Sequence, residues 1–137
     1  MLKLESKIGT ILTADEKIYN YLLNFNNIKT LIPGDKIKNW QTQEDSCRFT
    51  VEGLGEAGVR ILEKEPFKLI KLTGIDEGKY NFFFWIQLKQ IAEQDTKIRL
   101  TIHVDLNPVM QMMAKNPLKT FLDTLVDQLS KIDYERQ

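Results

Sequence analysis

The side chains that most often carry chemistry are scarce in this sequence, which holds one histidine, His103, and one cysteine, Cys47, in 137 residues. A histidine is the usual general base near neutral pH. Strand alternation, however, places His103 on the face that carries Lys97, Arg99 and Asp105, which favours a solvated surface residue. Cys47 has no basic residue predictably near it and is interpreted as inert. Two such residues far apart in the sequence do not make a zinc site, so neither a metal site nor a catalytic residue is predicted.

Residues 53–58 read Gly-Leu-Gly-Glu-Ala-Gly and match a glycine pattern that lets a backbone approach phosphate. A dinucleotide-binding version must follow a strand and open a helix, whereas residues 59–62 continue as strand. The kinase version needs a valine two residues after its last glycine and further His-Arg-Asp and Asp-Phe-Gly motifs, which are missing. A bulged hairpin is therefore the favoured interpretation.

The aromatic run from Phe82 to Trp85 is more informative, because a strand sends successive side chains to opposite faces. If Phe82 and Phe84 line the interior together with Ile86, then Phe83 and Trp85 lie on the outer face. Two interpretations stay open for this outer pair. It forms a contact surface, which would give a homodimer, or it is covered by neighbouring long side chains.

Three methionines, Met110, Met112 and Met113, precede Pro117 in the C-terminal segment. Helical periodicity puts Met110 on the buried stripe, Met113 at its edge and Met112 nearly opposite. Two interpretations of these methionines stay open: a flexible lid that adapts to ligands, or ordinary core packing. A bend at Pro117 would lift these turns from the sheet and leave space beneath them.

The expected interior is almost wholly apolar, with Ser6, Thr10 and Gln90 as its few polar candidates. Acid/base catalysis would have to use hydroxyls, or Glu52 or Arg60 if these face inward. An apolar pocket with one or two polar groups suits a hydrophobic ligand. The expected ligand-binding residues are Phe49, Val51, Ile61, Ile70, Leu72, Phe82, Phe84, Ile86, Ile102, Val104, Met110, Met113 and Phe121.

The elements that position these residues follow from periodicity. Residues 2–12 alternate as a half-buried strand, with Ile8 and Leu12 on the buried side. Thr13 and Glu16 have capping-box spacing, which predicts a helix from Ala14, and a second short helix covers residues 28–31. Six further strands are expected at residues 36–44, 47–54, 57–65, 68–75, 80–92 and 97–106, joined by short turns.

A long C-terminal helix is expected over residues 107–132, with Asn107 as its cap and Pro108 in its first turn. Its apolar stripe is made of Leu118, Phe121, Leu122, Leu125, Leu129 and Ile132. An antiparallel sheet with one apolar face, followed by one long amphipathic helix, is most simply closed by curling the sheet around the helix. The expected fold class is thus α+β, with seven strands and two short helices after the first strand.

Composition fits a single domain over residues 1–137, which should bury about two-thirds of the unfolded surface. Lysine plus arginine equal aspartate plus glutamate at 19 each, so no net charge favours nucleic acid or an anionic membrane. No apolar run reaches membrane-spanning length, and stable membrane insertion is not expected. The alternating start is unlike a signal peptide, which together with the single cysteine predicts a cytoplasmic protein.

This order of elements resembles the START-like superfamily, also called SRPBCC, along the whole chain. The more specific matching pieces are the Glu52-Gly53-Leu54-Gly55 hairpin, the Glu63-Lys64-Glu65-Pro66 turn, and the helix entry from Asn107-Pro108 to Asn116-Pro117 followed by residues 118–122. The resemblance implies a helix-grip fold, in which a seven-stranded sheet holds the C-terminal helix over a hydrophobic cavity.

That superfamily hosts several functions, so the resemblance alone leaves function open. The first expectation is a carrier or sensor that binds a lipid-like or polycyclic molecule without a cofactor and without chemistry of its own. The alternatives are a polyketide cyclase or dehydratase-like enzyme, and a protein-binding module of chaperone-activator type.

Overall fold

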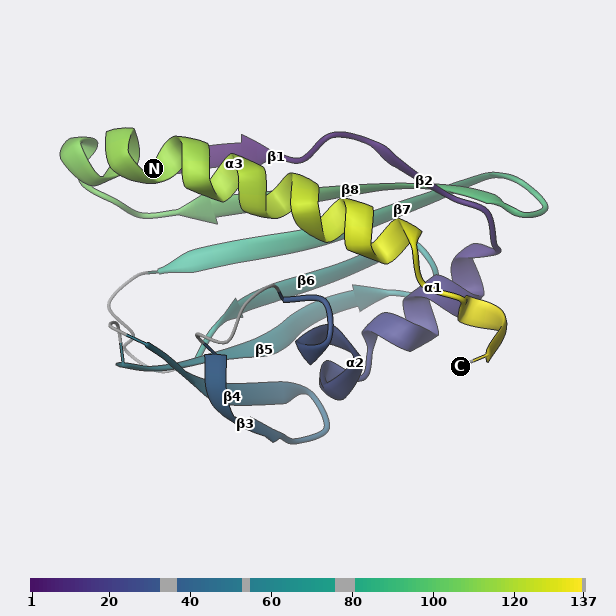
Figure 1. The fold of residues 1–137 in the computed structure, drawn as a ribbon, viewed down its shortest axis with the longest axis horizontal. Helices are drawn as coiled ribbons and strands as arrows, with labels where there is room; N and C mark the ends of the chain where they lie inside the picture. Colours follow the sequence, from purple (N-terminus) through teal and green to yellow (C-terminus); the bar gives the residue numbers. More distant parts are fainter. Residues whose placement is uncertain (33–36, 53–54, 76–80, 137) are drawn as a thin grey trace.

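The computed structural model describes residues 1–32, 37–52, 55–75 and 81–136 (Figure 1). The strands form one antiparallel sheet in the order β1-β8-β7-β6-β5-β4-β3, and β2 also pairs with β8. The strands are β1 (Leu2–Glu5), β2 (Gly9–Ile11), β3 (Ile37–Thr42), β4 (Ser46–Val51), β5 (Gly55–Glu65), β6 (Leu69–Gly74), β7 (Phe82–Ala92) and β8 (Asp95–Val104). The six strands expected after residue 36 are confirmed, with small shifts at their ends.

The first expected strand divides into β1 and β2, and the prediction that Ile8 and Leu12 face the core is wrong. The chain advances by four positions from Glu5 to Gly9, while the paired positions on β8 advance by only three, from Thr101 to Ile98. One extra residue inverts the alternation, because successive side chains point to opposite faces. Ile8 and Leu12 are therefore 66% and 75% exposed, whereas Ile11 is buried.

Gly9 lies where β2 passes closest to the C-terminal helix. A Cβ atom on Gly9 would lie 2.4 Å from Cγ1 of Val126, closer than two carbon atoms can approach. A larger residue would push β2 away from the helix. This close contact fixes the second half of the helix against the sheet edge.

Two short helices, α1 (Asp15–Leu22) and α2 (Phe25–Lys29), follow β2 as expected. The predicted capping box is wrong, because the cap of α1 is Ala14 without a side-chain hydrogen bond. The Thr13 hydroxyl instead donates to Glu135 at 3.4 Å, which links the start of α1 to the C-terminal tail. Ile18 and Leu22 of α1 are buried, as the periodicity predicts.

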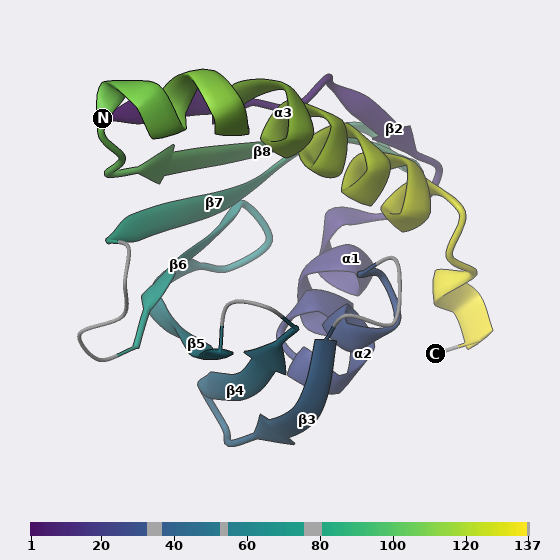
Figure 2. The same ribbon diagram turned by 60° about the vertical axis from the view of Figure 1, so that its left-hand side comes forward.

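The long helix α3 covers Pro108–Ser130 and is followed by a short 3-10 turn, η1 (Tyr134–Arg136). Its start is confirmed: Oδ1 of Asn107 accepts a hydrogen bond from the backbone N–H of Met110 at 2.9 Å. Pro117 lies inside the helix, and Figure 2 shows that the helix changes direction along its length. The helix contacts β1, β2 and β8, so it runs along one side of the curved sheet and not over its middle.

The core fills one end of the space between sheet and helices. Its members come from the inner face of the sheet, from α1 and α2, and from the second half of α3, where Leu122, Leu125, Val126 and Leu129 are buried. The expected α+β architecture with a curved antiparallel sheet and a long C-terminal helix is confirmed. In the described part of the chain, no helix is both long and apolar enough to cross a membrane.

Candidate ligand-binding face

The inner face of the sheet is built by apolar residues in register on three neighbouring strands. Phe84 of β7 lies opposite Ile102 of β8 on one side and opposite Leu72 of β6 on the other. One step along, Ile86 lies opposite Ile70 and Leu100. The sequence assignment of Phe82, Phe84, Ile86 and Leu88 to one face is confirmed by this register, since paired residues share a face.

Burial of this face changes along the strands. Leu88, Ile98 and Leu100 are at most 6% exposed. Phe82, Phe84 and Ile102 face the same side but are only half-buried. These three side chains are thus left partly uncovered, although Val104 opposite Phe82 and Leu72 opposite Phe84 are buried.

The first half of α3 shows the same incomplete burial. Leu118 and Phe121 are half-buried, whereas Leu122 one step further is fully buried. Met110 is half-buried, and Met113 is 74% exposed. Met113 therefore lies outside the buried side of the helix, next to it, as its place at the edge of the apolar stripe predicts.

The predicted ligand-binding residues divide into four groups, of which the exposed one holds Met113. Ile70, Leu72, Ile86 and Val104 form a buried floor. The half-buried members are Phe49, Ile61, Phe82, Phe84, Ile102, Met110 and Phe121. The side chain of Val51 lies outside the described residues, so its role stays a prediction.

Trp40 also belongs to this face, although strand alternation alone did not find it. Its ring stacks on Phe49 with 5.3 Å between ring centroids and 16° between ring planes. Both rings pack against the buried core while remaining half-buried. The signal in the sequence is the spacing of Ile37 and Trp40, because two apolar residues three apart break the period of a regular strand.

The polar candidates for catalysis lie away from this face or are already bonded. Ser6 is buried, but its hydroxyl accepts from the Leu100 N–H at 2.9 Å and donates to the Lys7 carbonyl at 2.7 Å. Glu52 and Arg60 are exposed. Acid/base chemistry on the inner face would have to come from other groups.

Cys47 is buried on β4 at 1% exposure. Burial raises the pKa of its thiol to about 11, which keeps it protonated at neutral pH. A protonated, covered thiol is a poor nucleophile, which agrees with the inert role expected from the sequence. Among the residues that the structure describes, no group of three or more histidine, cysteine, aspartate or glutamate side chains could hold a metal ion.

The outer face carries Phe83 and Trp85, as the alternation predicts. The ammonium group of Lys71 lies 4.8 Å from the centroid of Phe83 and 5.2 Å from that of Trp85, and His103 packs edge-on against Trp85 at 4.5 Å. Partial burial, followed by the charge of Lys3 and of Lys71, lowers the pKa of His103 below its ordinary value. The aromatic pair is half-buried under these neighbours, and its role in a homodimer stays a prediction.

Comparison with solved structures shows which fold the chain has. A conserved protein from Geobacillus kaustophilus is 16% identical, with a TM-score of 0.73 and 90% of each chain covered. XoxI from Bacillus cereus is 12% identical, with a TM-score of 0.75, 96% of this chain and 94% of that chain covered. Norcoclaurine synthase from Thalictrum flavum is 13% identical, with a TM-score of 0.73, 94% of this chain and 84% of that chain covered. The chain has the helix-grip fold.

No protein-family model and no curated protein sequence matches the chain. At these identities the solved structures establish the shared helix-grip fold and nothing about activity. Functional arguments for this helix-grip protein therefore rest on its own residues.

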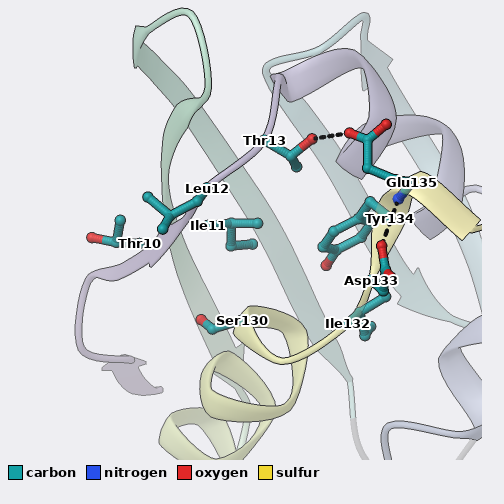
Figure 3. A pocket seen from close by; sticks show the side chains of 9 residues that line it. All are labelled: Thr10, Ile11, Leu12, Thr13, Ser130, Ile132, Asp133, Tyr134 and Glu135. Carbon is teal, nitrogen blue, oxygen red and sulfur yellow. Dashed lines mark hydrogen bonds between the residues drawn. The ribbon is translucent and has the colours of Figure 1, made fainter.

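A hollow of about 240 Å³ lies between β2 and the C-terminal tail (Figure 3). Its lining residues are Thr10, Ile11, Leu12, Thr13, Ser130, Ile132, Asp133, Tyr134 and Glu135. The hydroxyls of Thr13, Ser130 and Tyr134 already donate to other protein oxygens, and Glu135 pairs with Lys17. The contacts of Glu135 with Thr13 and Lys17 fasten the tail to the start of α1, and we assign this hollow a structural role.

Proposed function

We propose that the protein binds a hydrophobic, lipid-like or polycyclic small molecule on the inner face of its sheet, as a carrier or sensor. The observation that carries the proposal is the row of half-buried aromatic residues Phe82, Phe84 and Phe121 on the concave side of the fold. Each Å² of apolar surface removed from water contributes about 25 cal/mol, so a ligand that covers these rings gains affinity from area alone.

The arrangement of α3 supports this location. The helix contacts β1, β2 and β8. Its own residues Leu118 and Phe121 are half-buried, like Phe82 and Phe84 of β7. Small-molecule sites usually have an apolar face that the protein leaves partly uncovered. The floor of Ile70, Ile86 and Leu72 gives such a ligand a rigid surface.

A protein of the same fold has been solved with aromatic molecules bound. The norcoclaurine synthase structure from Thalictrum flavum in complex with dopamine and hydroxybenzaldehyde has a TM-score of 0.70 to this chain. This supports an aromatic or polycyclic ligand as compatible with the fold. The ligand of this chain is proposed from its own apolar face.

Binding can be tested with the neutral fluorescent probe N-phenyl-1-naphthylamine and with native mass spectrometry of freshly purified protein. We expect the probe to bind, and a co-purified hydrophobic molecule to appear as added mass that denaturation removes. Phe84→Ala should weaken probe binding about tenfold, because it removes ring area from the inner face.

Phe83→Ala is the matched control, since it removes the same ring from the neighbouring residue on the outer face. It should change probe binding less than about twofold. Equal losses in the two variants, or a parent protein that does not bind the probe, would contradict the proposal.

A further inference from the structure

The indole nitrogen of Trp40 is buried and has no hydrogen-bond partner among the residues that the structure describes, which sets it apart from the other polar groups described near the inner face. Buried N–H groups are nearly always paired with protein, water or ligand, because an unpaired donor loses its bonds to water without replacement. This donor therefore needs an acceptor. Among the described residues, Phe49 is stacked directly on the ring, and both rings pack against the apolar core.

A bulge in β3 directs Trp40 to this face. Lys38 lies opposite Thr50 and Gln41 lies opposite Arg48, so Asn39 and Trp40 together face the single residue Phe49. Bulges redirect side chains and are frequent next to binding sites. Here the extra residue lets the tryptophan ring turn inward onto Phe49.

The bulge requires an unusual backbone conformation. Asn39 has a φ of 58°, a left-handed conformation that asparagine tolerates better than most residues. Its side-chain amide donates to the Thr50 hydroxyl at 3.2 Å, which holds the bulge against β4. Left-handed residues other than glycine cost free energy and concentrate at sites with a function.

The position of β3 allows a ligand to reach the nitrogen. β3 is the last strand of the sheet and pairs only with β4 within it. Strands bonded on one side open at lower cost than central strands. The side chains that cover the nitrogen can therefore shift to admit an acceptor while Trp40 stays stacked on Phe49.

We propose that Trp40 Nε1 donates a hydrogen bond to an oxygen of the bound ligand, so that the ligand is a neutral apolar molecule with a ketone-like or alcohol-like acceptor. A carboxylate is disfavoured, because Trp40 and Phe49 pack against an apolar core, and the cationic residues beside them in the sequence, Lys38 and Arg48, are exposed. This inference rests on the proposed function. It adds the chemical class of the ligand and the residue that orients it.

Three probes separate these chemistries: 2-acetylnaphthalene, 2-ethylnaphthalene, which has the same shape without the oxygen, and the anion 2-naphthoate. We expect the ketone to bind about three- to tenfold more tightly than either of the others, the range for one neutral hydrogen bond. Trp40→Phe keeps an aromatic ring on Phe49 but removes the donor. It should abolish the preference for the ketone, and the affinity lost with the smaller ring should be the same for the ketone and for 2-ethylnaphthalene.

Nuclear magnetic resonance provides a direct readout, because the sequence holds only two tryptophans and therefore two indole N–H signals. The Trp40 signal should move on titration with the ketone and not with 2-ethylnaphthalene, and Trp85→Phe identifies it without touching the inner face. Equal affinity for ketone and ethyl compound, a preference that survives in Trp40→Phe, or tighter binding of 2-naphthoate would each overturn the inference and leave the proposed function standing. Failure of all three probes to bind would overturn both.

Discussion

The two ends of the inner face carry the same kinds of side chain but differ in burial. At the closed end, defined by Leu88, Ile98, Leu100, Leu122 and Val126, every side chain is at most 6% exposed. At the open end, defined by Phe82, Phe84, Ile102, Leu118 and Phe121, every side chain is half-buried.

The difference follows from what covers each end. The closed end has α1, the second half of α3 and the tail over it, with Ile18, Leu22 and Tyr134 joining the buried core. Among the described helices, the open end has the first half of α3 beside it. Apolar alternation alone therefore does not decide whether one end of a face is fully buried. The burial depends on which helices lie over that end.

The largest effect is expected on stability, in a comparison of two leucines on adjacent turns of α3. Leu122→Ala should lower the free energy of unfolding by about 2–5 kcal/mol, because it leaves a cavity in a fully packed region. Leu118→Ala should cost less than about 1.5 kcal/mol, because Leu118 is already partly open to solvent. Urea denaturation of both variants measures the difference.

The two substitutions share the same change in helix propensity, so that term cancels. Equal losses of stability would mean that the open end is packed as tightly as the closed end. The comparison on which the ligand proposal rests would then be wrong.

A smaller effect is expected from the titration of Cys47, which is buried with the core residues. Its thiol has an ordinary pKa of 9.0, raised in the folded protein to about 11. Above pH 9 the unfolded chain releases this proton while the folded chain retains it. The stability due to the buried thiol is thus complete below pH 9 and is lost as pH rises to about 11.

Urea midpoints of the parent and of Cys47→Ala at pH 8, 9 and 10 test this prediction. The parent should lose more stability than the variant over this range. Burial also raises the pKa of Tyr134, so both proteins share a further loss above pH 10. Identical pH profiles would show that the thiol ionises freely and that water reaches this part of the core.

Most of the fold could be predicted from the sequence, because its elements are long and strongly periodic. The alternation from Ile98 to Val104 and the stripe from Leu118 to Leu129 each specify one apolar face. Asn107 and Pro108 mark the start of α3 by their own chemistry. Such signals depend only on neighbouring residues in the sequence, and the structure confirms them.

The failures come from single-residue irregularities that periodicity cannot detect. One extra residue between Glu5 and Gly9 reverses the faces of Ile8 and Leu12. One extra residue in β3 turns Trp40 inward. The candidate site was predicted as inward strand residues together with Met110, Met113 and Phe121 of the helix. Its open end, however, depends on how α3 lies along the sheet, which tertiary packing decides.

The smallest expected effect concerns the outer face, where Phe83 and Trp85 lie behind the rings of the open end. If this face joins two copies of the chain, Trp85→Lys should weaken the dimer at least about tenfold, as buried tryptophans often dominate interfaces. Sedimentation equilibrium of the parent and the variant measures this, with Thr42→Lys, an exposed site on β3, as the control for added charge. A parent that stays monomeric at all concentrations would instead assign the pair to the alternative role, in which Lys71 covers both rings as part of a single chain. The open end would then be the only one of the two aromatic clusters left to bind a partner molecule.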